Sequence, residues 1–338
     1  MLRNRHLKFA LLGAAALAAS AGFAWAADWN SGGSIALPKD MVAAASAFSD
    51  YMSRAADVRA DFRDGEAVHQ SLKTGVAYEQ VQFEAGMISY GALVAMQDPG
   101  FLAGVSRAAH SEADRQALAA RLEADPAQVL RLDGADVAAR EVESALMSRA
   151  TPVADAGKAV KQAAYDVQHE AWSKERIANL PGRLKEVKLL STSPYPGTDG
   201  DGARLSRAML QLPPAGGGTP AVSPVVARSL ALAAVAILGE AKPSDMPQVQ
   251  PLLTEYFSAD CLHMAKLMLY QCMAVASPHY ENVFCLGQHA LADTGQCVAA
   301  AVTASPDRTP PPPRVILAST APVKAPPKAS RHHHRRHS

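Results

Sequence analysis

Apolar residues recur at helical spacing along most of the chain. One such pattern covers Met41 to Ala55 and begins after Pro38, a residue typical of helix starts. A second runs from about Tyr78 to Gln97, where Gly86 and Gly91 lower helix propensity unless another backbone packs closely against them. These patterns predict two helices.

Further helices are marked by their ends. Capping residues that start helices occur at Asp98-Pro99, at Ser111 with Asp114, and at Asp125-Pro126. A long helix is expected from Asp155 to Lys174, with Tyr165 and Trp172 on one face, and an apolar helix from Ser223 to Leu238, with Gly239 as its C-cap. Because few runs of β-branched residues occur, the sequence predicts an all-α fold, an irregular multi-helix bundle.

Composition changes between residues 193 and 220. Proline, glycine, aspartate and serine dominate this segment, which includes the run Pro213-Pro214-Ala215-Gly216-Gly217-Gly218, so a loop is expected. The sequence therefore predicts a helical domain over residues 27–192, a loop over 193–220, and a helical hairpin region over 221–303 that packs on the same body.

Four cysteines give the sharpest structural signal. In an antiparallel helical hairpin, facing residues have a nearly constant sum of residue numbers. That sum is 558 for Cys261 with Cys297 and 557 for Cys272 with Cys285, whereas the other pairing across the hairpin gives 546 and 569. Ser277-Pro278 supplies the turn between the two helices. The sequence predicts the disulfides Cys261–Cys297 and Cys272–Cys285, which staple the hairpin.

The spacing of the second cysteine pair departs from regular helix geometry. Twelve residues leave Cys285 and Cys297 about 120° out of phase on an α-helix, and Gly287 is expected to mark a local distortion that accommodates this difference. The layout is similar to twin cysteine-x9-cysteine helical hairpins, although the spacers here are ten and eleven residues. Zinc binding by Cys261 with His263 and by Cys285 with His289 is the alternative.

The N-terminus has the pattern of a secretory signal peptide. Basic residues precede the apolar stretch Phe9 to Phe23, and small residues at Ala24 and Ala26 form a cleavage motif before Ala27. Residues 1–26 are expected to be removed between Ala26 and Ala27. The mature chain is then expected in the periplasm or outside the cell, with no transmembrane helix, and its thiols should pair there. An uncleaved anchor helix is the alternative.

Charge is distributed unevenly among these segments. The 338 residues include 33 Lys and Arg against 32 Asp and Glu, a net charge of +1. The predicted signal peptide carries +3 and residues 304–338 carry +6, which leaves −8 on residues 27–303. No basic body is therefore present that would favour sequence-specific nucleic-acid binding, while 49% hydrophobic residues suffice for a folded core.

Residues 304–338 have the composition of a disordered basic tail rich in proline and histidine. The prolines favour an extended polyproline II conformation that would reach about 100 Å. Arg331, Arg335 and Arg336 are expected to contact an anionic envelope component or an acidic protein surface. Zinc, copper or nickel could instead be bound by the neighbouring histidines His332, His333, His334 and His337. A tail that serves only solubility is a further alternative.

Two segments carry a resemblance to known proteins. Lys161 to His169 and Ala276 to His289 are similar to segments of exported bacterial proteins that have no assigned activity. The resemblance covers most of the mature body and implies a secreted helical protein, without implying a reaction.

Candidate metal chemistry rests on two carboxylate–histidine motifs, Glu66-x-x-His69 and Asp166-x-x-His169. Such pairs build di-iron sites in four-helix bundles when two further glutamates join them, and these would be Glu84 and Glu143. Because exposed helix faces carry the same pairs commonly, we favour a solvated face. No cofactor is predicted from these motifs.

Other catalytic and ligand motifs are absent from the sequence. It contains no G-x-S-x-G, H-E-x-x-H or Walker motif and no C-x-x-C-H haem attachment motif. Asp199-Gly200-Asp201-Gly202 resembles the start of a calcium loop, but Ala203 and Leu210 stand where acidic ligands are needed, so a flexible turn is expected. The favoured hypothesis is a non-enzymatic envelope binding or scaffolding module. A periplasmic metal-binding protein and an unrecognised envelope enzyme are the alternatives.

Overall fold

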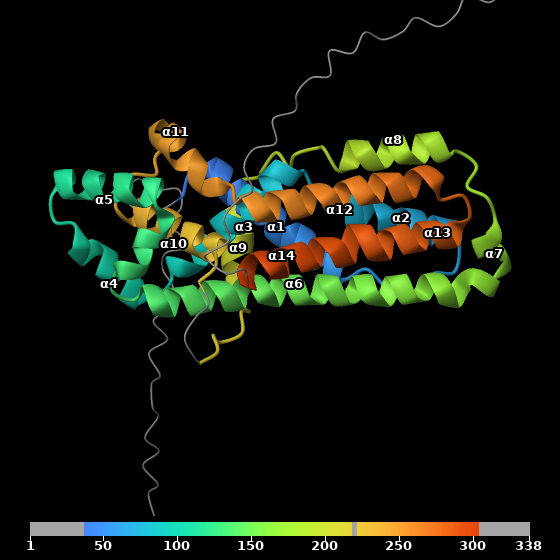
Figure 1. The fold of residues 1–338 in the computed structure, drawn as a ribbon, viewed down its shortest axis with the longest axis horizontal. Helices are drawn as coiled ribbons and strands as arrows, with labels where there is room; N and C mark the ends of the chain where they lie inside the picture. The colour runs from blue at the N-terminus through green and yellow to red at the C-terminus, as the bar shows by residue number, and fades with distance from the viewer. Residues whose placement is uncertain (1–36, 218–221, 304–338) are drawn as a thin grey trace, which may run out of the picture. The chain divides into compact units, whose positions relative to one another are not determined.

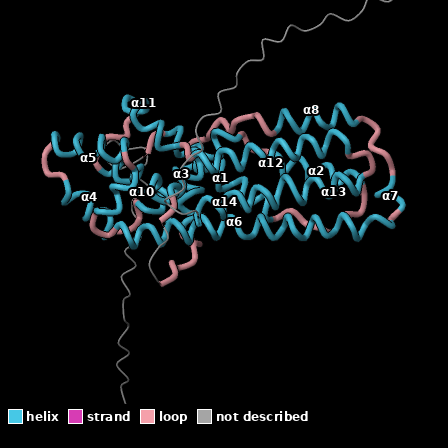
Figure 2. The backbone as a smooth tube through the Cα atoms, viewed as in Figure 1, coloured by secondary structure: helices cyan, strands magenta, loops and turns pink. Residues whose placement is uncertain are grey.

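The computed structural model describes residues 37–217 and 222–303, which fold into helices joined by loops (Figures 1 and 2). The α-helices are α1 (Lys39–Ala56), α2 (Gly65–Val76), α3 (Gln80–Ala95), α4 (Pro99–Ala108), α5 (Glu112–Ala124), α6 (Ala135–Asp166), α7 (Ala171–Lys174), α8 (Leu180–Leu190), α9 (Asp201–Met209), α10 (Pro224–Ile237), α11 (Met246–Val249), α12 (Tyr256–Val275), α13 (His279–Cys285) and α14 (Asp293–Thr303). Within the two described ranges no strand forms, so the prediction of an all-α bundle is confirmed. None of these helices is both long and apolar enough to cross a membrane.

Helix α3 lies at the centre of the bundle. From Phe83 to its end nearly every residue of α3 is buried, which is typical of a helix surrounded by protein. It packs against α1, α6, α10 and α12. The condition that offsets the cost of its glycines is met, because a Cβ on Gly86 would lie 2.2 Å from the carbonyl oxygen of Ala44 in α1. At Gly91 the neighbour is the Ser229 side chain of α10, at 2.5 Å.

Aromatic side chains of α1 and α3 form the centre of the core. Phe48 and Tyr51 of α1 meet Phe83 of α3 with ring centroids 5.0 and 5.5 Å apart, and Tyr78 lies 4.7 Å from Phe83. Phe48, Tyr51 and Phe83 are all buried. The prediction of a helix over Met41 to Ala55 is therefore confirmed, and its apolar face supplies this core.

Helix α6 is longer at its start than the sequence predicts. The expected helix began at Asp155, but α6 begins at Ala135 and continues through Pro152. A proline inside a helix costs about 3 kcal/mol. Burial on both sides of it, at Ala150 and Val153, offsets this cost.

The end of α6 also differs from the prediction. The helix stops at Asp166, and a 3-10 turn over Val167–His169 separates it from the short helix α7. Tyr165 and Trp172 consequently lie on different helices rather than on one face. Tyr165 is half exposed, whereas the Trp172 ring lies 6.4 Å from that of His279.

The C-terminal hairpin packs backbone to backbone against α6. A Cβ on Gly157 of α6 would lie 2.2 Å from the amide nitrogen of Ala292, and one on Gly287 would lie 2.3 Å from that of Lys161. Gly295 approaches α6 in the same way. Only glycine permits these contacts, so α6 and the last helical segments lie side by side and antiparallel (Figure 1).

Both predicted disulfides are present in the hairpin. Cys261 is bonded to Cys297 and Cys272 to Cys285, with Cα–Cα distances of 5.6 and 5.7 Å. The expected distortion is a π-helical segment over Leu286–Ala292. Its hydrogen bonds reach one residue further than those of an α-helix, so the segment absorbs the twelfth residue and brings Cys285 and Cys297 onto one face.

The segment 193–220 is not a loop throughout, as the sequence suggested. Helix α9 occupies Asp201–Met209 within it. Asp201 is buried and accepts hydrogen bonds from the Thr198 hydroxyl and backbone N–H and from the Tyr195 hydroxyl. These contacts form an ordered helix start where a flexible turn was expected.

Candidate functional site

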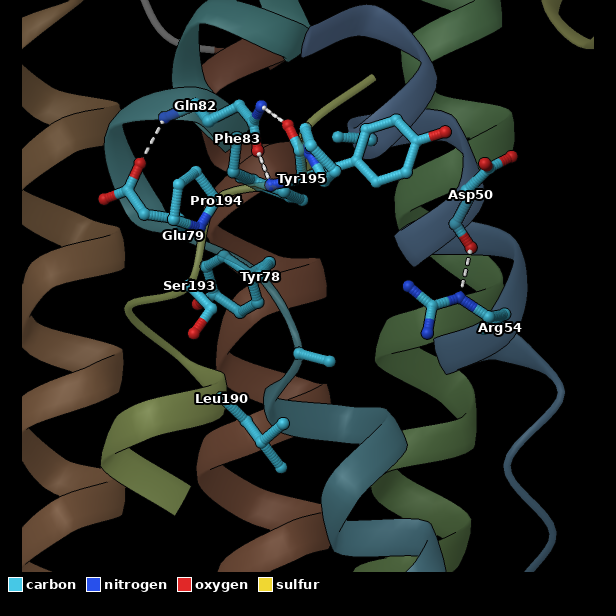
Figure 3. Close-up of a pocket in the computed structure, with 13 residues that line it drawn as sticks. Asp50, Arg54, Tyr78, Glu79, Gln82, Phe83, Leu190, Ser193, Pro194 and Tyr195 are labelled. Carbon is cyan, nitrogen blue, oxygen red and sulfur yellow. Dashed lines mark hydrogen bonds between the residues drawn. The ribbon is translucent and has the colours of Figure 1, made fainter. Parts of the chain in front are cut away.

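A cleft of about 440 Å³ opens between three segments that are distant in sequence (Figure 3). One wall is α1, the second is the link from α2 to α3 with the first turn of α3, and the third is the segment Leu190–Pro196, which begins at the last residue of α8. Its apolar lining comes from Ala47, Ala77, Phe83, Leu190, Pro194 and Pro196. A mostly apolar hollow with a few polar groups is typical of small-molecule sites.

The α1 wall supplies the charged side chains Asp50 and Arg54. The Arg54 Nε donates a hydrogen bond to the Asp50 backbone carbonyl at 3.3 Å, which holds its guanidinium toward the cleft (Figure 3). The Asp50 carboxylate lies 3.4 Å from the guanidinium of Arg204 in α9. Asp50 is thus paired with Arg204 of α9.

The second wall is fixed by a helix cap. The carboxylate of Glu79 accepts hydrogen bonds from the backbone N–H groups of Val81 and Gln82 at 3.1 and 2.7 Å, which satisfies the first turn of α3. Beside it, Tyr78 is 8% exposed, and its hydroxyl lies 3.2 Å from that of Thr294. Burial raises the pKa of Tyr78 far above its ordinary value, so this phenol stays neutral.

The third wall is attached to the body at two points. The Gln82 side-chain amide donates to the Tyr195 carbonyl and accepts from the Tyr195 N–H, both at 2.7 Å (Figure 3). Four residues earlier, the Ser191 hydroxyl lies 2.5 Å from that of Tyr270 in α12. The third wall of the cleft, Leu190–Pro196, is therefore held in place by hydrogen bonds, and we call this segment the strap.

A buried lysine joins the second and third walls from below. The Lys266 ammonium donates to the backbone carbonyl of Tyr78 at 2.6 Å and to that of Ser191, and it lies 4.0 Å from the centre of the Tyr78 ring. Burial lowers the pKa of Lys266 to about 8, against the opposing effect of Glu79 and Glu84. This single side chain fixes the relative position of two cleft walls.

Polar groups at the rim of the cleft form a network around Arg204. The Tyr195 hydroxyl donates to Asp201 at 2.9 Å, and Arg204 donates to the Tyr195 hydroxyl at 2.7 Å and to Asp201. Burial opposes ionisation of Asp201, but hydrogen bonds from Thr198 and Tyr195 lower its pKa below the ordinary value. The charged groups of Asp201 and Arg204 are therefore paired with each other.

The candidate metal residues named from the sequence do not come together. His69 lies 3.3 Å from Glu186 of α8, while Glu66 accepts a hydrogen bond from Gln70. Asp166 accepts one from Gln162 at the other motif, and His169 lies in the turn after α6. In residues 37–217 and 222–303, no group of three or more His, Cys, Asp or Glu side chains could hold a metal ion.

The alternative zinc site at the cysteines is wrong. All four thiols are consumed in disulfides, so none is available as a thiolate ligand. His289 instead pairs with Asp293, with Nδ1 and the carboxylate oxygen 2.8 Å apart. The predicted tail residues that would bind metal or polyanions, and the cleavage site, lie outside the described residues.

A smaller pocket of about 260 Å³ lies beside the Cys272–Cys285 disulfide. The aromatic residues Tyr165, Tyr280 and Phe284 line it. It holds no cluster of polar groups comparable to that of the cleft between α1 and the strap.

Sequence reasoning missed the residues that build the cleft. Arg54, Gln82 and Lys266 belong to helices whose patterns were recognised, but a cation or amide on a helix is ordinarily a solvated residue. Lys266 alone carried a usable signal, since it follows Ala265 on the apolar face that Leu262 and Leu269 also share.

Comparison of the chain with models of known protein families, with curated proteins and with solved structures finds no match. The resemblance to exported bacterial proteins therefore stays an expectation from the sequence.

Proposed function

We propose that the chain is an exported binding protein whose helical body holds a small ligand in the cleft and whose basic tail contacts an anionic partner. The observation that carries the first part is the construction of the cleft. Its second and third walls are joined directly by the Gln82–Tyr195 hydrogen bonds, between residues 113 positions apart in sequence, and Lys266 of α12 binds both walls. A ligand that binds to such a preformed site loses less free energy, because few loops have to become ordered on binding.

The export part of the proposal is supported from two sides. The first 26 residues have the pattern of a cleavable signal peptide. All four cysteines are joined in disulfides, which persist in oxidising compartments such as the periplasm.

Occupancy of the cleft can be tested on protein recovered from the bacterial periplasm without denaturation. Native mass spectrometry should detect a non-covalently bound small molecule on the wild-type protein. The Ala47→Trp variant should lose it, because the indole ring would fill the cleft. Ala117→Trp, at an exposed position of α5, is the matched control and should keep it. A wild-type protein without ligand, or a ligand retained by Ala47→Trp, would contradict the proposal.

The tail part of the proposal can be tested by sedimentation with lipid vesicles. The mature chain should sediment with vesicles that contain phosphatidylglycerol and much less with pure phosphatidylcholine, because seven Lys and Arg side chains lie beyond residue 303. Binding should weaken as salt is raised. A chain ending at Ala304 that sediments equally well would exclude the tail as the contact. Binding that appears only with added zinc would favour the histidine alternative.

A further inference from the structure

The cleft presents one positive charge that no described residue neutralises. Arg54 uses its Nε on the Asp50 backbone carbonyl, and its two terminal nitrogens have no hydrogen-bond or ion-pair partner within residues 37–217 and 222–303. They point toward Tyr78, across the cleft (Figure 3). A guanidinium presents paired N–H donors in a plane, a geometry that fits a carboxylate.

The acidic side chains around the cleft are already engaged. Glu79 is directed at the N-terminal amides of α3. The Asp50 carboxylate faces Arg204, which also binds Asp201. A cationic ligand would have to compete with these partners, whereas an anionic ligand would find Arg54 unopposed.

The rest of the cleft lining favours a ligand with a flat apolar ring. Phe83 and Tyr78 form the floor, and Leu190, Pro194 and Ala77 stand around it. The Lys266 ammonium lies 4.0 Å from the Tyr78 ring centre and adds positive potential below the floor. A volume of about 440 Å³ lies at the small end of ligand pockets, so a compound of one or two rings fits.

We propose that the cleft binds a small aromatic monocarboxylate, with its carboxylate on the Arg54 guanidinium and its ring over Tyr78 and Phe83. A phosphate dianion fits less well, because Arg54 is the one cation whose charged group is free at the cleft among the described residues. This inference rests on the proposed function and names the ligand class of the same site.

The experiment compares three probes of nearly equal shape: phenylacetate, phenylacetamide and phenethylamine. Their affinities for the mature protein would be measured by saturation-transfer NMR and calorimetry at pH 7 and low salt. Phenylacetate should bind at least about tenfold more tightly than the amide, because a charge-assisted hydrogen bond replaces a neutral one. Phenethylamine should bind most weakly.

Substitutions connect this preference to one side chain. Arg54→Gln should bring phenylacetate down to the affinity of the amide, whereas Arg54→Lys should retain part of the preference. Arg59→Gln is the matched control, at an exposed arginine in the loop after α1 and outside the cleft lining. Equal affinity for acid and amide, an unchanged preference in Arg54→Gln, or no binding of any probe would overturn the inference.

The variant Ala47→Trp separates this failure from failure of the proposed function. If the amide or the amine binds best and Ala47→Trp abolishes that binding, the ligand class is wrong while the cleft remains a binding site. If probe binding survives Ala47→Trp, the probes bind elsewhere, and the cleft loses its assigned role as well. Unchanged far-UV circular dichroism and melting temperature would verify that each variant is folded.

Discussion

Lys266 shows how one residue can hold a site together at a measurable cost. The residue is 7% exposed, and its ammonium donates to carbonyls on two different cleft walls, at Tyr78 and Ser191. These bonds satisfy the buried charge only in part, because burial still lowers its pKa to about 8. The folded state therefore releases this proton more readily than the unfolded chain does.

The sign of the resulting pH dependence follows from this difference. Between pH 8 and the ordinary lysine value of 10.5, the unfolded chain holds the proton that the folded state has lost. Stability should therefore rise with pH in this window. We expect Lys266 to add about 2 kcal/mol to the free energy of unfolding between pH 7.5 and 9.5, measured by urea unfolding.

Matched variants isolate this contribution. Lys266→Met should remove the rise, and Lys185→Met, at an exposed lysine of α8, should leave it in place. The buried tyrosines Tyr51, Tyr78 and Tyr90 have raised pKa values, so their opposite effect falls above pH 10. A wild-type stability that stays flat or falls from pH 7.5 to 9.5 would contradict the buried charged lysine.

At the scale of the elements, the close contact between α6 and the C-terminal hairpin depends on glycine residues, which have no side chain. Gly157 and Gly287 each bring one backbone against the other, with no room for a Cβ. An alanine in a helix is ordinarily about 1 kcal/mol more favourable than glycine. At these two positions glycine should instead give the more stable protein.

We expect Gly157→Ala and Gly287→Ala each to lower the free energy of unfolding by about 1–3 kcal/mol, because overpacking forces the backbones apart. Gly216→Ala is the control, since a Cβ there would meet nothing within 4 Å. Its effect should stay within about 0.5 kcal/mol. Urea unfolding monitored by circular dichroism measures all three. A Gly287→Ala variant as stable as the wild type would show that the two backbones are further apart.

For the molecule as a whole, the two disulfides join α12 to α13 and α14, the two arms of the C-terminal hairpin. They close loops of different length, with sequence separations of 36 for Cys261–Cys297 and 13 for Cys272–Cys285. A crosslink stabilises mainly by restricting the unfolded chain, and a longer closed loop restricts it more. The outer disulfide should therefore contribute more to stability than the inner one.

Replacing Cys261 and Cys297 together by alanine should cost about 4 kcal/mol, and replacing Cys272 and Cys285 together about 3 kcal/mol. Guanidinium unfolding of both double variants measures the difference. Mass spectrometry of a non-reduced digest should recover the two predicted crosslinked peptides from the wild-type protein. Crosslinks between Cys261 and Cys285, or free thiols, would contradict the fold of the hairpin.

The local features of this protein were determined by its sequence. Helix ends such as Ser223-Pro224 and Gly239 were predictable because caps and prolines act within one turn. The disulfide pairing was also predictable, because two antiparallel helical arms around one turn leave a single register that joins all four cysteines. Even the π-helical segment was signalled by the spacing of Cys285 and Cys297 and by Gly287.

Only the tertiary structure decided where α6 begins and which residues meet in the cleft. The helix continues through Pro152, where the residues on either side, Ala150 and Val153, are buried, and the sequence pattern shows the cost of the proline but not this burial. The cleft joins Arg54, Tyr78 and Tyr195 from three separate segments, and each side chain is ordinary within its own helix or loop. Long-range packing places Arg54 beside Tyr78 in one cleft and buries Lys266 between two cleft walls, because both depend on neighbours far away in the chain.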